Sequence, residues 1–63
     1  MISLTKQQII DEIMEVQAKN YFRSEFFARS SLENFSLDDL ITEYRYQMGP
    51  LISDHEKIQV VTS

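Results

Sequence analysis

The carboxylates of this chain are its candidates for a chemical role. Asp11, Glu12 and Glu15 fall in the first turns of one predicted helix, and Asp38 and Asp39 open a second one. Acidic residues at a helix start complement the positive end of the helix dipole by about 0.3–1 kcal/mol each, which needs no further role. We expect these carboxylates to stabilise helices. The alternative is that Asp38 positions a water molecule or a cation on a partner's site.

Other arrangements that carry out catalysis or bind metals are missing from the sequence. The chain has no cysteine, which excludes disulfides and thiolate metal sites, and His55 is its single histidine. One histidine cannot build a zinc site, and it stands in a tail with no visible scaffold for a serine nucleophile. One glycine is too few for a phosphate-binding loop. The sequence therefore predicts a protein that is not an enzyme and that has no metal or cofactor.

The charge balance disfavours nucleic acid as a partner. Ten acidic and six basic residues give a net charge of −4, and the lysines and arginines are scattered along the chain. Binding to phosphates requires clustered positive charge. No apolar stretch approaches the roughly 20 residues of a membrane-spanning helix. We expect a cytoplasmic protein that binds neither nucleic acid nor membrane.

The sequence contains two helix starts with the same arrangement of residues, and the carboxylates lie on the helices that follow them. Thr5 is followed three residues later by Gln8, and Ser36 is followed in the same way by Asp39. The hydroxyl accepts from an unpaired backbone N–H, and the later side chain can bond back to the N–H of the capping residue. We predict an all-α fold, a two-helix antiparallel hairpin with helices over residues 6–29 and 37–48. This hairpin forms a domain over residues 1–50, and Gly49 ends its second helix.

The first predicted helix carries an apolar arc of about 160°, which is wide for a surface helix. The second helix carries one narrow stripe, which contains Leu37, Leu40, Ile41, Tyr44 and Met48. A chain of this length also buries only about 60% of the surface that its unfolded form exposes. Because the second helix is too narrow to cover the arc, we expect a homo-oligomer, most simply a dimer.

Phe22 and Phe26 lie together on the opposite, charged side of the first helix. Either the helix is interrupted near Asn20 and both rings enter the core, or they form an interface with a second copy or another protein. Two rings one turn apart are typical of interface hot spots. The predicted partner-binding residues are Phe22, Phe26, Tyr46, Lys19, Arg23 and Glu15.

The tail over residues 51–63 is compatible with three structures. Residues 58–62 are mostly β-branched and alternate, which favours a strand, and such a strand would need the edge of a second chain as its partner. Residues 53–56 could instead cap a short helix, and a disordered end is the third alternative.

The second predicted helix resembles part of a known phosphatase signature. Leu37, Asp38, Leu40 and Ile41 match the last residues of Ser-Gln-Glu-Leu-Asp-x-Leu-Ile, although residues 34–36 are Asn-Phe-Ser. This signature belongs to the small sporulation phosphatases that act on aspartyl-phosphate response regulators. The resemblance implies an accessory phosphatase whose functional residue is Asp38.

Two further resemblances are equally short. The apolar stripe from Leu37 to Tyr44, followed by Gly49, is similar to the LisH dimerisation motif, although Pro50 stands where that motif usually has an aromatic residue. A likeness to the small bacterial Gns family covers Met48, Leu51, Ser53, Lys57 and Ile58.

These patterns favour a small non-enzymatic protein–protein interaction module, a regulator, inhibitor or adaptor that acts as a helical dimer. Two alternatives stay open. One is the accessory aspartyl-phosphate phosphatase, and the other is a purely structural dimerisation unit without a foreign partner.

Overall fold

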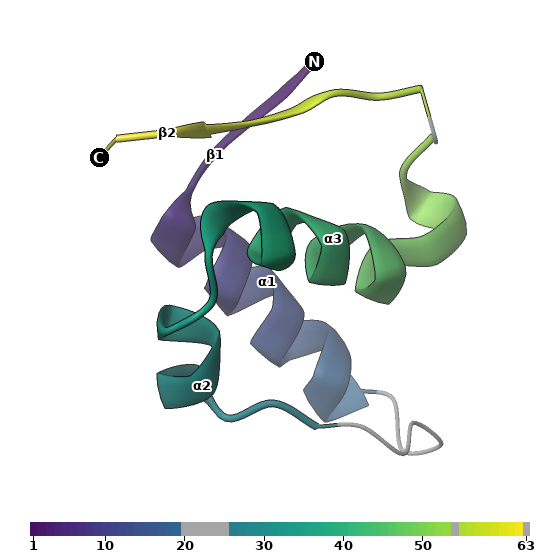
Figure 1. The fold of residues 1–63 in the computed structure, drawn as a ribbon. Helices are drawn as coiled ribbons and strands as arrows, with labels where there is room; N and C mark the ends of the chain where they lie inside the picture. Colours follow the sequence, from purple (N-terminus) through teal and green to yellow (C-terminus); the bar gives the residue numbers. More distant parts are fainter. Residues whose placement is uncertain (20–25, 54, 63) are drawn as a thin grey trace.

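The computed structural model of the chain describes residues 1–19, 26–53 and 55–62. Its elements in chain order are β1 (Ile2–Thr5), α1 (Lys6–Lys19), α2 (Arg29–Glu33), α3 (Leu37–Met48), the 3₁₀ turn η1 (Gly49–Leu51) and β2 (Ile58–Val61). Figure 1 shows both strands on one side of the helices, with β2 running in the direction opposite to α3.

The first and last elements form a two-stranded parallel sheet. Ile2 lies opposite Ile58 and Thr5 opposite Val61, and the Ile2 N–H donates to the Lys57 carbonyl at 2.7 Å. Parallel strands cannot be joined by a tight hairpin and need a crossover, which here consists of the helical part of the chain.

This sheet contradicts the predicted all-α hairpin. The described part of the chain has three helices and a two-stranded sheet, which is a small mixed α/β fold. Residues 58–61 do form a strand, as one of the three alternatives for the tail stated. Their partner is β1 of the same chain and not the edge of a second chain. Strand β1 was not predicted, because four residues directly before a helix cap are too few to show a pattern.

The first helix is shorter than predicted. It ends at Lys19, residues 26–28 are not helical, and α2 is a separate helix of five residues. A side chain prevents Phe27 from joining a helix, because Gln17 Oε1 accepts from the Phe27 N–H at 2.9 Å and Gln17 Nε2 donates to the Phe27 carbonyl at 3.0 Å. The predicted interruption near Asn20 lies outside the described residues.

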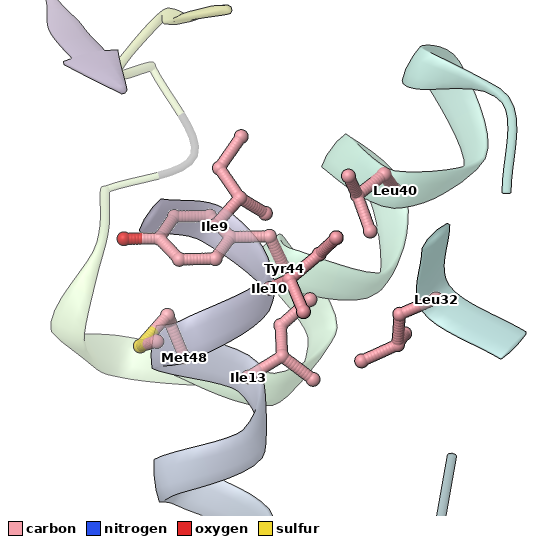
Figure 2. Close-up of a cluster of buried hydrophobic side chains, with 7 residues drawn as sticks. All are labelled: Ile9, Ile10, Ile13, Leu32, Leu40, Tyr44 and Met48. Carbon is pink, nitrogen blue, oxygen red and sulfur yellow. The ribbon is translucent and has the colours of Figure 1, made fainter. Parts of the chain in front are cut away.

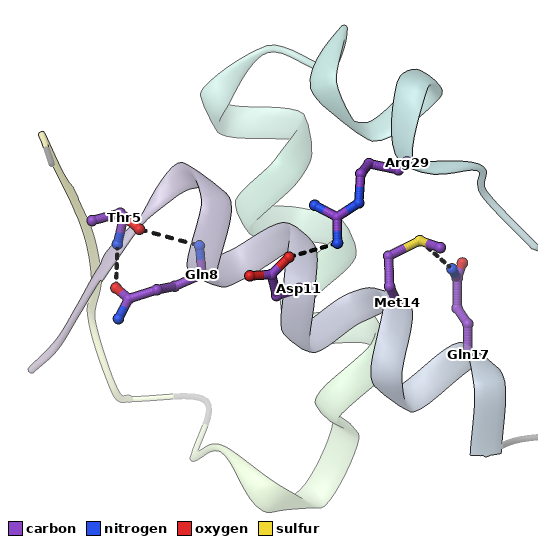
Figure 3. A network of polar contacts seen from close by, with 6 residues as sticks. All are labelled: Thr5, Gln8, Asp11, Met14, Gln17 and Arg29. Atoms are coloured by element: carbon purple, nitrogen blue, oxygen red, sulfur yellow. Dashed lines mark hydrogen bonds and ion pairs between the residues drawn. The ribbon is translucent and has the colours of Figure 1, made fainter.

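Both predicted helix starts are confirmed. The Gln8 N–H donates to Thr5 Oγ1 at 3.1 Å and the Thr5 N–H donates to Gln8 Oε1 at 2.8 Å, so the cap of α1 is closed in both directions (Figure 3). Ser36 Oγ accepts from the Asp39 N–H at 3.2 Å, and α3 spans the predicted residues. Gly49 follows with φ 55° and ψ −125°, a conformation that other residues rarely adopt.

The hydrophobic core lies where the three helices meet. Figure 2 shows its buried side chains, which are Ile9, Ile10, Ile13, Leu32, Leu40, Tyr44 and Met48. Leu4, Ile58 and Val60 of the sheet pack against this cluster from one side. The apolar arc of α1 is therefore covered within one chain by α2, α3 and the sheet, so its width is no longer a reason to expect a dimer.

Candidate interaction surface

The predicted partner-binding residues come from three parts of the fold. Glu15 and Lys19 pair with each other across one turn of α1 at 2.8 Å, and the bonded Lys19 ammonium lowers the pKa of the Glu15 carboxyl. Phe26 stands before α2 and is 65% exposed, and Tyr46 on α3 is 64% exposed. The remaining two predicted residues, Phe22 and Arg23, lie outside the described part of the chain.

Two carboxylates of α1, those of Asp11 and Glu12, connect this helix to the other two. The first turn of α1 contains no acidic residue, so the predicted dipole role is wrong for this helix. Asp11 accepts from the Arg29 guanidinium of α2 at 2.6 Å (Figure 3). Glu12 accepts from the Tyr44 hydroxyl of α3 at 3.0 Å. Burial and the Glu12 carboxylate together raise the pKa of Tyr44 to about 12.

The acidic residues of α3 do lie where the sequence placed them. Asp38 and Asp39 are in the first turn, both exposed, and the dipole of α3 stabilises their charge. Across residues 1–19, 26–53 and 55–62, no three side chains of His, Cys, Asp or Glu gather closely enough to hold a metal ion. In the same ranges, no helix has the length and apolar character that crossing a membrane requires.

The outer edge of β2 is a surface that the sequence analysis did not identify. Because the Ile2 N–H donates to the Lys57 carbonyl, the backbone groups of Lys57 and Gln59 face β1. Backbone groups alternate between the two sides of a strand, so those of Ile58 and Val60 point away from β1. In the sheet formed by the described residues, β2 has β1 on one side and no strand on the other.

This outer edge lacks the features that usually protect edge strands. Residues 58–62 read Ile-Gln-Val-Val-Thr, without a charged residue, proline or glycine. Exposed edges in native proteins are usually interrupted by charges, prolines or bulges, because an uncovered strand is a template for pairing. The outer edge of β1 offers less, since the Thr5 N–H is already bonded to Gln8 and α1 starts at the next residue.

A depression of about 360 Å³ adjoins the second half of β2. Val60 of β2 and the following Thr62 line it on one side, Thr5 at the end of β1 and Lys6 at the start of α1 on another, and Leu37 lines it from the start of α3. Leu37 was predicted to belong to the buried stripe of α3, but it is 50% exposed because it sits at the first position of the helix, beyond the core. Unpaired backbone groups beside an apolar depression are what peptide recognition by strand addition uses.

Comparison with known proteins gives no relative: no family model, no curated protein and no solved structure matches this chain. The likeness of α3 to the sporulation phosphatases and to the LisH motif, and that of the tail to the Gns family, therefore stay resemblances of short motifs.

Proposed function

We propose that this protein is a small non-enzymatic protein–protein interaction module that binds an extended partner segment along the outer edge of β2. The observation that supports the proposal is the uncovered, uncharged edge itself. A sheet of two strands is marginal in water, and a third strand bonded to Ile58 and Val60 would extend it. Such a module acts as a regulator or adaptor in the cytoplasm, and its partner is a protein.

Two features of the edge have different roles in this binding. The N–H and C=O groups of Ile58 and Val60 supply hydrogen bonds that any extended segment can use. The depression beside Leu37 accepts a side chain of that segment, which favours apolar residues at one position. Backbone pairing therefore gives affinity, and the depression gives selectivity.

The test compares two proline variants in a pull-down with mass spectrometry. Val60→Pro removes an N–H that points to the outer edge and leaves the bonds to β1 intact, as proline is tolerated on edge strands. Ser3→Pro is the matched control, because it removes an outward N–H from β1. The tagged wild-type protein and each tagged variant are incubated with a lysate of cells that also express an untagged copy of the chain.

We expect the wild-type protein and Ser3→Pro to retain a stoichiometric polypeptide that Val60→Pro loses, while the circular dichroism spectra of all three agree. Equal retention by Val60→Pro, or no retained polypeptide with the wild-type bait, would show that the β2 edge is not a binding site.

A further inference from the structure

Building on the proposed strand-binding function, we infer that the partner segment carries a lysine or arginine beside Thr62, and that this cation pairs with the Asp38 carboxylate. An apolar residue two positions away in the segment lies beside Val60, over the depression. The partner is therefore a basic extended segment of another protein, with an apolar and a cationic side chain on one face. The argument rests on the direction of the side chains, the position of Asp38 and its unpaired charge.

The side chains of a third strand on this edge alternate between two faces. Ile58 and Val60 are half-buried and pack against the core, whereas Gln59 is exposed on the open face of the sheet. Residues directly opposite each other on neighbouring strands point to the same face. The partner residues beside Ile58, Val60 and Thr62 therefore point toward the helices.

Helix α3 lies on the β2 side of the sheet. Strand β1 leads directly into α1, whereas the Arg45 guanidinium of α3 donates to the Glu56 carbonyl just before β2. A third strand on the outer edge of β2 is therefore further from α1, and the side chains on its inner face meet α3.

Asp38 lies on the face of α3 that these side chains meet. It precedes Arg45 by seven residues, which is two turns of helix and about 10 Å along the axis on nearly the same face. Because α3 and β2 run in opposite directions (Figure 1), this displacement leads from the start of β2 to its end. Leu37, the preceding residue, lines the depression at that end, which places Asp38 there as well.

The Asp38 carboxylate has no cation within the described part of the chain. It is exposed, and the ion pairs of the described residues join other groups. Lys6 lines the depression, but its ammonium donates to the Glu33 carbonyl at 2.7 Å. A lysine or arginine beside Thr62 has an apolar stem that covers the half-exposed Leu37 and a cationic head that reaches Asp38.

A second copy of this chain does not meet the same requirement. Residues 58–62 contain no lysine or arginine, so a second β2 on the edge places no cation beside Asp38. Lys57 has the parity of Gln59 and therefore points to the open face of the sheet, away from α3. Each copy also carries a net charge of −4, which opposes the association of two copies and favours a basic partner.

The experiment is a selection from a phage-displayed library of random peptides against the immobilised full chain. With the wild type we expect enriched peptides that carry lysine or arginine two positions from an apolar residue. With Asp38→Lys, aspartate or glutamate should replace the basic residue, because the charge that faces it is reversed. Asp39→Lys is the matched control, since it removes the same charge from the same turn of α3, about 100° further round the helix and away from the strand. It should select the same basic peptides as the wild type.

An enriched basic peptide then allows a measurement in solution by fluorescence anisotropy. Its affinity should fall about tenfold for Asp38→Lys and stay within about twofold for Asp39→Lys. High salt should weaken binding to the wild type, because an exposed ion pair is screened. Asp38→Asn, which keeps the shape of the side chain, should lose this salt dependence. Circular dichroism of each variant checks that it is folded.

The outcomes separate this inference from the function on which it rests. Enriched peptides without a basic preference, or with a preference that Asp38→Lys leaves unchanged, overturn the inference. If Val60→Pro abolishes their binding, the strand-binding function stands. A wild-type chain that enriches no basic peptide, but associates with itself through an edge sensitive to Val60→Pro, assigns the edge to a second copy. Neither enrichment nor self-association overturns both.

Discussion

The helical core and the sheet bury their side chains to different extents. Ile9, Ile10 and Ile13 of α1 are completely inaccessible to solvent, whereas Ile2, Leu4, Ile58 and Val60 of the sheet are all half-buried. The helices pack against one another on several sides. The sheet has one face covered by the helices, and each of its strands is only four residues long. The helical part is therefore enclosed within one chain, whereas the sheet of the described residues has an outer edge without a partner strand.

Truncating an isoleucine in each region should give clearly different losses of stability. Ile13→Ala leaves a cavity among fully buried side chains and should lower the free energy of unfolding by about 3 kcal/mol. Ile58→Ala removes the same atoms from a half-buried strand and should cost about 1 kcal/mol, because the site can relax. Urea unfolding of both variants at the same low protein concentration checks the difference. Equal losses would mean that the sheet is as essential to the fold as the core.

The two buried glutamines of the helices are expected to differ in their contribution to stability. Gln17 is 6% exposed and bonds both backbone groups of Phe27, so Gln17→Leu should cost about 2 kcal/mol by leaving those groups unpaired. Gln47 is 5% exposed, and its Oε1 has no partner within the described residues. Gln47→Leu serves as the control and should change stability by less than about 0.5 kcal/mol. Thermal melts of the pair measure both effects.

A further prediction concerns the hydrogen bond between α1 and α3. The pKa of Tyr44 is raised to about 12 in the folded chain, against an ordinary value of 10.0. Since the folded state holds this proton more tightly, the stability that it contributes is complete below pH 10 and is lost as the pH rises toward 12. Tyr44→Phe removes the bond to Glu12 and should cost about 1 kcal/mol at neutral pH.

The loss of stability at alkaline pH distinguishes the titration of Tyr44 from the titration of other groups. Tyr44→Phe should lose less stability than the wild type between pH 10 and 12, because the group that titrates is gone. Identical pH profiles for the two proteins would show that the hydroxyl does not couple to folding. Circular dichroism at a series of alkaline pH values is sufficient for this measurement.

Features that depend on neighbours in sequence could be predicted. The cap at Ser36, the spacing of Leu40, Tyr44 and Met48, and the stop at Gly49 are local, and together they define α3 before any tertiary contact is known. The alternation in residues 58–62 indicated a strand for the same reason. The bounds of α3 are therefore correct, and the strand appears among the stated alternatives.

Features that depend on distant pairing could not be predicted. The outer edge of β2 is defined by which residues face β1, and this depends on the pairing of Ile2 with Ile58 from opposite ends of the chain. A register shift of one residue would turn Gln59 toward the helices in place of Val60, so the alternation disfavours it. What the local pattern does not show is that β1 is the partner strand. In the same way, no local pattern marks Gln17 as the residue that bonds the backbone of Phe27.

The pairing of the first strand with the last has a consequence for the kinetics of folding. Contacts between such distant segments close the longest loop of the chain, so the sheet is expected to form after the helices have packed. Until then residues 58–62 remain uncovered on both edges. The outer edge of β2 is thus completed in the last step of folding, and association between chains competes with that step when the protein refolds at high concentration.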